Sequence, residues 1–185
     1  MSNLICRLIS LVSLFTFPVA ALALQADIRT NHGTISIDLN MEKAPQSVRN
    51  FTRYVREGHY NGTIFHRVIA GFMIQGGGYD TRIRRKATHE PVINESDNGL
   101  SNTRGTIAMA RTRNPDSATS QFYINVVDNP HLDGQPGRPG YTVFGKVIRG
   151  MDVVDTIAAL PTRAWGQFRN LPVEPVIIES VTLSE

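Results

Sequence analysis

A guanidinium surrounded by aromatic, thioether and amide side chains is the chemical feature that stands out in this sequence. Arg67 belongs to a segment, residues 65–77, that is rich in such side chains. Residues 105–110 and 120–125 supply more of the same groups. None of these segments contains a base next to a nucleophile. The chemistry they offer is therefore hydrogen bonding from a fixed cation against apolar walls, with no covalent step.

Strand periodicity predicts how Arg67 is presented. Successive side chains of a strand point to opposite faces, so we expect Arg67 on the same face as Phe65 and His66 on the other face. A turn at residues 70–71 reverses the chain. Residues 72–75 are then expected to lie beside Arg67.

The remaining pattern predicts a mainly β fold. Apolar or alternating runs bounded by turn residues predict strands at 26–40 (a hairpin turning at 31–33), 64–69, 72–75, 106–110, 122–127, 142–148 and 174–183. Two helices are expected, at residues 45–58 and 151–160. Short strands with few helices favour a closed antiparallel barrel capped by two helices. Two long loops, 76–99 and 130–141, flank the segments named above and are expected to be functional.

Composition excludes several classes of protein. The chain has 185 residues, 41% of them hydrophobic, which is enough for one domain with a real core. A single cysteine excludes an internal disulfide framework and a cysteine-rich metal site. A net charge of only +3 gives no support for nucleic-acid binding.

The N-terminus has the pattern of a secretory signal. Arg7 precedes an uncharged run at residues 8–24 that ends in small residues. The Ala21-Leu22-Ala23 triplet predicts cleavage after residue 23, with Ala26 as a second candidate. We therefore predict a signal peptide at 1–23 and one domain at 24–185, exported to the periplasm by the general pathway. A membrane anchor or a buried helix are the alternatives for the run, and Cys6 precedes it, which does not suit a lipoprotein.

These segments, together with Leu132-Asp133-Gly134 and residues 143–147, resemble the cyclophilin family of peptidyl-prolyl cis-trans isomerases, and most closely its periplasmic bacterial members. The resemblance covers about residues 27–183. It implies an eight-stranded antiparallel β-barrel with two α-helices and a hydrophobic groove on its outer face. It also implies an isomerase without cofactor or metal that acts as a monomer on proline-containing polypeptides, with no nucleic acid and no membrane after the signal is removed.

The resemblance also assigns the site residues. It makes Arg67 the catalytic residue. The substrate-binding residues that it implies are Phe72, Met73, Gln75, Ala110, Arg111, Gln121, Tyr123, Leu132 and Tyr141. Of these, Gln75 and Gln121 are expected to position the peptide.

The chain departs from the family pattern at a few of these positions. His131 stands where tryptophan is common, and that tryptophan is associated with tight cyclosporin binding. Tyr123 replaces a usual phenylalanine, Tyr141 a common histidine and Arg111 a common asparagine. Cyclosporin binding is therefore not carried over to this chain.

Other interpretations of the sequence are weaker. Asp116, Ser117 and His131 could form a hydrolase triad, but no nucleophile elbow surrounds the serine. The histidines show no metal-ligand spacing. The basic cluster at 82–86 is typical of a solvated loop, with a phosphate- or client-binding patch as the alternative and a secreted nucleic-acid binder as a weaker rival. A proline-binding module without catalysis is the main rival.

Overall fold

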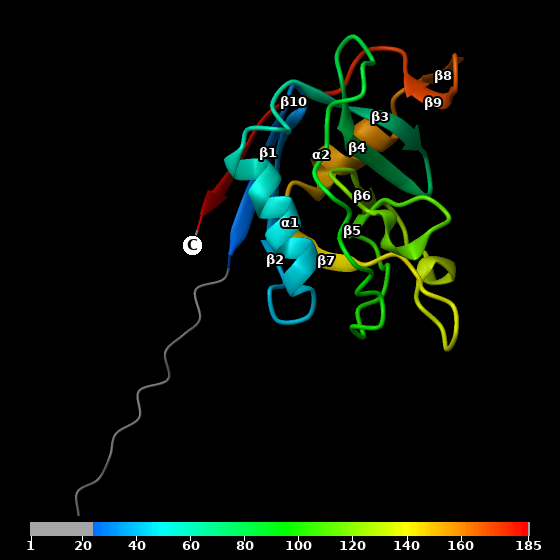
Figure 1. The fold of residues 1–185 in the computed structure, drawn as a ribbon. Coiled ribbons are helices and arrows are strands. Elements are labelled where there is room, and N and C mark those ends of the chain that lie inside the picture. Colours follow the sequence, from blue (N-terminus) through cyan, green and yellow to red (C-terminus); the bar gives the residue numbers. More distant parts are fainter. Residues whose placement is uncertain (1–23, 185) are drawn as a thin grey trace, which may run out of the picture.

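The computed structural model describes residues 24–184, which form a closed antiparallel barrel (Figure 1). Its strands are β1 (Gln25–Thr30), β2 (Gly33–Leu39), β3 (Thr63–Ile69), β4 (Met73–Asp80), β5 (Thr106–Met109), β6 (Phe122–Asn125), β7 (Val143–Arg149) and β10 (Ile177–Ser184). They pair in the order β1-β10-β3-β4-β6-β5-β7-β2, and β2 closes the barrel on β1. The predicted eight-stranded barrel is confirmed. The predicted signal peptide lies outside the described residues.

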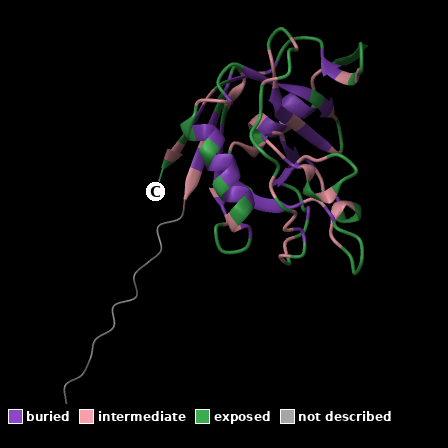
Figure 2. Cartoon of the chain, viewed as in Figure 1, coloured by how far each residue is buried: buried purple, intermediate pink, exposed green. Residues whose placement is uncertain are grey.

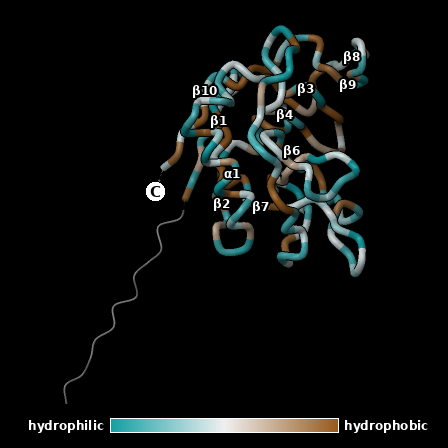
Figure 3. The backbone as a smooth tube through the Cα atoms, in the orientation of Figure 1, coloured by the Kyte–Doolittle hydropathy of each residue, from teal (hydrophilic) through white to brown (hydrophobic). Residues whose placement is uncertain are grey.

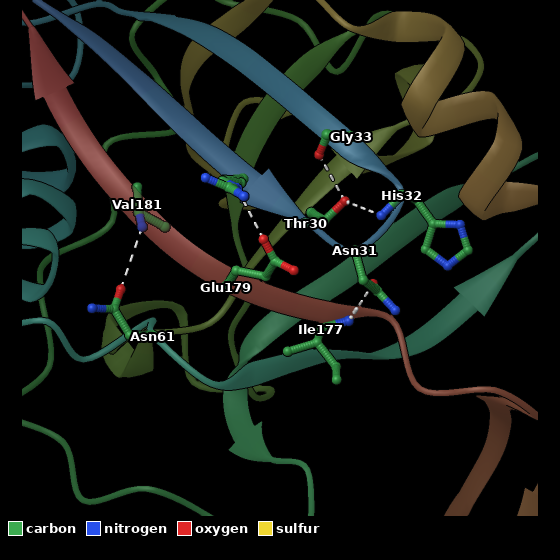
Figure 4. Close-up of polar contacts among 9 residues, drawn as sticks. Thr30, Asn31, His32, Gly33, Asn61, Ile177, Glu179 and Val181 are labelled. Carbon is green, nitrogen blue, oxygen red and sulfur yellow. Dashed lines mark hydrogen bonds and ion pairs between the residues drawn. The ribbon is translucent and has the colours of Figure 1, made fainter.

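The predicted hairpin of β1 and β2 is present, and its turn is fixed to β10. The hydroxyl of Thr30 donates to the carbonyl of Gly33 at 2.8 Å and accepts from the N–H of His32 at 3.0 Å. The N–H of Ile177 donates to Oδ1 of Asn31 at 2.9 Å (Figure 4). The side chain of Thr30 thus closes the turn itself, and that of Asn31 adds to the backbone hydrogen bond from Asn31 N–H to the carbonyl of Ile177.

Helix α1 (Pro45–Arg56) begins without a capping side chain of its own. Ala44 stands at the N-cap position and makes no side-chain bond. Glu95, from the loop between β4 and β5, accepts hydrogen bonds from the N–H groups of Gln46 at 2.9 Å and Ser47 at 2.8 Å. A carboxylate there also meets the positive end of the helix dipole. The cap therefore fastens the long loop to the helix.

Aromatic rings fill the interior. Phe51 of α1 lies 5.2 Å from the ring of Tyr60, 5.8 Å from Phe122 and 5.4 Å from Phe144. All four are fully buried, and the helix shows its buried and exposed residues on different sides in Figure 2. Hydrophobic segments follow the barrel strands, and the connecting loops are more hydrophilic (Figure 3).

The second predicted helix is also confirmed, as α2 (Met151–Ala158), which packs against β2, β3 and β4. Gly150 begins it in the left-handed region at φ +85°, where a Cβ would lie 2.3 Å from the carbonyl oxygen of Thr34. Neither α-helix of residues 24–184 combines the length and apolar character that a bilayer crossing requires.

A two-stranded hairpin outside the barrel was not predicted. It consists of β8 (Thr162–Trp165) and β9 (Phe168–Pro172). Every residue of β8 is exposed, so the alternation that reveals a strand is missing. The hairpin packs through β9 against β3, at the upper right of Figure 1. A loop was also predicted from Gly76, but β4 continues to Asp80, because glycines hide its strand pattern.

Candidate active site

A β-bulge in β3 turns Arg67 out of the barrel interior. From Phe65 to Arg67, β3 advances two residues while β4 advances one. Phe65 and Val68 are both buried in the core, although an odd number of steps separates them. The prediction that Phe65 and Arg67 share a face is therefore wrong, because the extra residue at His66 inverts the alternation.

A second hydrophobic cluster lies apart from the core, over β4, β6, β5 and β7. Its buried members are Met73, Ala108, Tyr123 and Val143. The partly buried side chains packed around it are Ile69, Phe72, Leu100, Ala110, Leu132 and Tyr141. Half-covered apolar surface of this kind is typical of a site that accepts an apolar group.

A cavity of about 180 Å³ opens over this cluster. Its lining residues are Arg67, Phe72, Met73, Gln75, Ala110, Arg111, Tyr123, Leu132 and Tyr141. These are the residue predicted as catalytic and all the predicted substrate-binding residues except Gln121. Gln121 lies beside the cavity, where its Oε1 accepts a hydrogen bond of 3.0 Å from Nε2 of Gln75. The structure therefore brings together every site residue predicted from the sequence.

A chain of amides orients the Arg67 guanidinium. Its Nη1 donates to Oε1 of Gln75 at 3.3 Å, and Gln75 donates in turn to Gln121. The guanidinium carbon lies 6.0 Å from the ring centroid of Phe72, at the edge of cation–π range. Within residues 24–184 Gln75 is the hydrogen-bond partner of this guanidinium, so its other N–H donors can serve a ligand in the cavity.

Glycines of β4 make room for this chain of amides. A Cβ at Gly78 would lie 2.5 Å from Cγ of Gln121. Gly77 has φ +83°, and a Cβ there would lie 2.8 Å from Cε1 of Tyr60. A side chain at Gly78 would displace Gln121, and one at Gly77 would displace the buried ring of Tyr60, so the position of Gln121 depends on Gly78.

Arg111 supports the rim of the cavity. Its Nε donates to the carbonyl of Gly140 at 3.0 Å and its Nη2 to that of Pro139 at 2.8 Å. The guanidinium carbon lies 4.4 Å from the ring centroid of Tyr141. Because these groups occupy the guanidinium, the side chain of Arg111 holds the loop that carries Tyr141 in place.

Buried polar groups lie beneath the apolar floor. The hydroxyl of Tyr123 donates to Oδ1 of Asn102 at 2.6 Å, and Nδ2 of Asn102 donates to Oδ1 of Asp133 at 2.9 Å. Burial, and secondarily the nearby Tyr141, raise the pKa of Tyr123, so the phenol remains a donor. Asp133 directly follows the 3₁₀ helix η2 (Pro130–Leu132), which carries a wall residue. The cluster thus links the floor of the cavity to its wall.

Asn129 holds another lining residue, Phe72, in place. Its Nδ2 donates to the backbone carbonyl of Phe72 at 3.0 Å and to Oδ1 of Asn125 at 2.9 Å. Asn102 and Asn129 were not predicted as site residues. Asn125 gave a signal that could have found them, since a fully buried amide in an apolar strand requires polar partners.

His131 packs against the same lining residue, Phe72. Its ring lies 5.8 Å from that of Phe72, with 23° between the planes. Although it is exposed, it covers one face of the phenylalanine. His131 therefore stacks on the lining of the cavity rather than pairing with Ser117.

The alternative of a hydrolase triad does not form within residues 24–184. The Ser117 hydroxyl is bonded to the carbonyl of Asn114 at 2.7 Å and to Thr112, with no histidine among its partners. No group of three or more histidine, cysteine, aspartate or glutamate side chains suited to a metal occurs in the part of the chain that the structure describes.

The family model for "Cyclophilin type peptidyl-prolyl cis-trans isomerase/CLD" matches residues 25–183. The chain belongs to this family. A curated peptidyl-prolyl cis-trans isomerase of Acinetobacter baylyi is 59% identical over 85% of this chain and 84% of its own length. Peptidyl-prolyl cis-trans isomerase B of Escherichia coli is 58% identical over 84% of this chain and 97% of its own length. This cyclophilin is thus a peptidyl-prolyl cis-trans isomerase.

A solved structure agrees with this fold. The crystal structure of a cyclophilin-type isomerase from Cryptosporidium parvum matches with a TM-score of 0.73 and 28% identity, covering 88% of this chain and 98% of that one. The same isomerase was also solved in the presence of the dipeptide Ala-Pro, with a TM-score of 0.73 and 27% identity.

Proposed function

We propose that this cyclophilin catalyses rotation about X-Pro bonds through Arg67, which hydrogen-bonds the proline nitrogen in the twisted transition state. The observation that carries the proposal is the cavity itself. The Arg67 guanidinium and the Gln75 amide line one small pocket together with apolar side chains. At about 180 Å³ this pocket is smaller than the roughly 300 Å³ at which sites for drug-sized ligands begin, and it suits a single ring.

Catalysis must lower the barrier to rotation about the X-Pro bond. An X-Pro bond resists rotation by ~18–20 kcal/mol because the amide nitrogen shares its lone pair with the carbonyl. Twisting the bond returns the lone pair to nitrogen, where a donor can bind it. Arg67 would therefore bind the transition state better than the planar ground state, which is the requirement for catalysis.

The apolar residues would hold the ring while the bond turns. Phe72, Met73, Tyr123 and Leu132 line the cavity, with Tyr123 and Met73 forming its buried floor. Excluding water from this space strengthens the hydrogen bond from Arg67. Lowering the barrier by ~7 kcal/mol would accelerate rotation ~10⁵-fold, without cofactor or metal.

The substrates that we propose are flexible proline-containing polypeptides that fold after export to the periplasm. X-Pro bonds relax unaided in tens of seconds or longer, which is slow enough to limit folding. The isomerase would act as a monomer on such segments. It would bind neither nucleic acid nor, once the signal peptide is removed, a membrane. A chaperone role follows from the same activity.

Export rests on residues 1–23 acting as a signal peptide. An isomerase A of Dickeya dadantii, 49% identical, matches over 98% of this chain and 97% of its own length. The Escherichia coli relative matches over only 84% of this chain but 97% of its own length. N-terminal sequencing of the protein from a periplasmic fraction should begin near Leu24, and an intact Met1 confined to the cytosol would overturn the proposal.

Exchange NMR on a short X-Pro peptide tests the activity. The purified protein should accelerate isomerisation, and Arg67→Ala should lower kcat/KM by about 10²-fold or more while the peptide still binds. Arg29→Ala is the matched control, because Arg29 pairs with Glu179 at 2.9 Å and does not line the cavity. Binding without acceleration, or full activity of Arg67→Ala, would favour a proline-binding module instead.

A further inference from the structure

A second cavity adjoins the one that holds the proline in the proposed function. It measures about 400 Å³, and its lining residues are His66, Arg67, Gln75, Tyr79, Gln121, Gln167, Phe168, Arg169 and Asn170. We name it the hairpin cavity, after the β8–β9 hairpin that supplies residues 167–170. Arg67 and Gln75 line both cavities, so a bound polypeptide can reach from one to the other.

The hairpin wall is held in place by aromatic contacts. The ring of Phe168 lies 5.0 Å from Tyr79 and 5.9 Å from His66, and the rings of His66 and Tyr79 are 4.7 Å apart. His66 is only 4% exposed, and its Nδ1 has no hydrogen-bond partner within residues 24–184. Three packed rings thus fasten β9 to β3 and β4, so the cavity is a built feature of the fold.

The lining of the hairpin cavity is cationic and rich in amides. It contains two arginines and no aspartate or glutamate. Neither Arg67 nor Arg169 takes part in an ion pair within residues 24–184. Burial lowers the pKa of His66 to about 4, so the two arginines supply the charge near pH 7. A carboxylate offers acceptors that suit both guanidinium and amide donors.

We propose that the hairpin cavity binds an acidic side chain of the substrate within two residues of the proline. This inference rests on the proposed function, because the proline must first occupy the neighbouring cavity. An extended chain advances about 3.3 Å per residue, so two residues span roughly 7 Å. Arg67 is committed to the reacting bond. Arg169 is therefore the residue that distinguishes an acidic from a neutral neighbour.

The test compares matched peptides that differ at one position. Glutamate or glutamine is placed one or two residues before or after the proline, and both Kd and kcat/KM are measured by NMR. At one position or more, the glutamate peptide should be favoured about two- to five-fold at low salt. Arg169→Gln should return the ratio of the glutamate peptide to the glutamine peptide to about one. Gln167→Glu should reduce this ratio, because its carboxylate would repel the glutamate of the peptide. High salt should weaken it as well.

Arg163→Gln is the matched control. Arg163 is an exposed arginine on β8 of the same hairpin but lines neither cavity, so the ratio should persist in this variant. A ratio of one or less at every position, or a preference that survives Arg169→Gln, overturns the inference. If the protein isomerises none of the peptides, the proposed function is wrong instead. The ratio of the Kd values of the glutamate and glutamine peptides then still decides whether the hairpin cavity selects an acidic side chain.

Discussion

The phenolic hydroxyl of Tyr123 lies 2.6 Å from Oδ1 of Asn102, so a residue of the cavity floor is bonded to a fully buried amide. Through Nδ2 of Asn102 the contact continues to Asp133, next to the wall residue Leu132. The shape of the cavity therefore depends on polar groups that do not line it.

Replacing Tyr123 by phenylalanine should test this dependence. The ring would remain, but Asn102 would lose a buried donor, at a cost of about 1–2 kcal/mol in the free energy of unfolding. Urea denaturation measures this cost. Tyr141→Phe is the control, since the Tyr141 hydroxyl has no partner among the hydrogen bonds of residues 24–184. Equal stability of the two variants would show that the Tyr123 hydroxyl contributes nothing.

Asp133 should make the wall sensitive to acid. Burial would raise its pKa, but hydrogen bonds from Ser101 and Asn102 outweigh this and lower the pKa below 3.8. A carboxyl whose pKa is lowered by folding stabilises the folded state at pH values above its unfolded pKa, and this contribution is lost as the pH falls below 3.8 through the lower pKa of the folded state. We expect the free energy of unfolding to decline there, and less steeply in Asp133→Asn. An unchanged profile in that variant would contradict the assignment.

His66 should add a pH dependence in a higher range. Burial lowers its pKa from 6.5 to about 4, so between these values the unfolded chain binds a proton that the folded protein does not. Stability should therefore fall as the pH drops from about 6.5 toward 4. Urea unfolding of His66→Phe should show a flatter profile over this range. Replacing the exposed His131 by glutamine is the control, and a profile that flattens equally there would refute the prediction.

The cap supplied by Glu95 should matter to stability. Glu95→Ala removes the acceptor for the N–H groups of Gln46 and Ser47, and should lower the free energy of unfolding by about 2 kcal/mol. Glu90→Ala, at an exposed position of the same loop, should change it by less than about 0.5 kcal/mol. Chemical denaturation of both variants decides whether the contact stabilises helix α1.

The sequence predicted the barrel and its helices well because their signals are local. Alternation at Ile35, Ile37 and Leu39 marks a strand within a few residues, and Pro45 marks the start of a helix. The hairpin of β8 and β9 lacks such a signal, since it packs on the barrel through one side of β9. Its existence depends on distant contacts such as that of Phe168 with Tyr79.

The residues of the candidate site could likewise be predicted only in part from the sequence. The residues that line the cavity were predicted because their motifs match those of a family, although strand alternation gave the wrong face for Arg67. A bulge depends on how two strands pair, which the sequence of one strand does not contain. The supporting amides of Asn102 and Asn129 were missed because their role exists only when loops far apart in the chain meet the same strand.

The bulge in β3 also sets a rule for changes in chain length. Before His66 the odd-numbered residue Phe65 points into the core, and after it the even-numbered residue Val68 does so. Deleting His66 would restore a single alternation, with Phe65 and Val68 still inward and Arg67 still outward. A one-residue insertion or deletion elsewhere in β3 would instead turn one of these side chains to the opposite face, so the strand should tolerate the loss of its bulge residue better than any other change in its length.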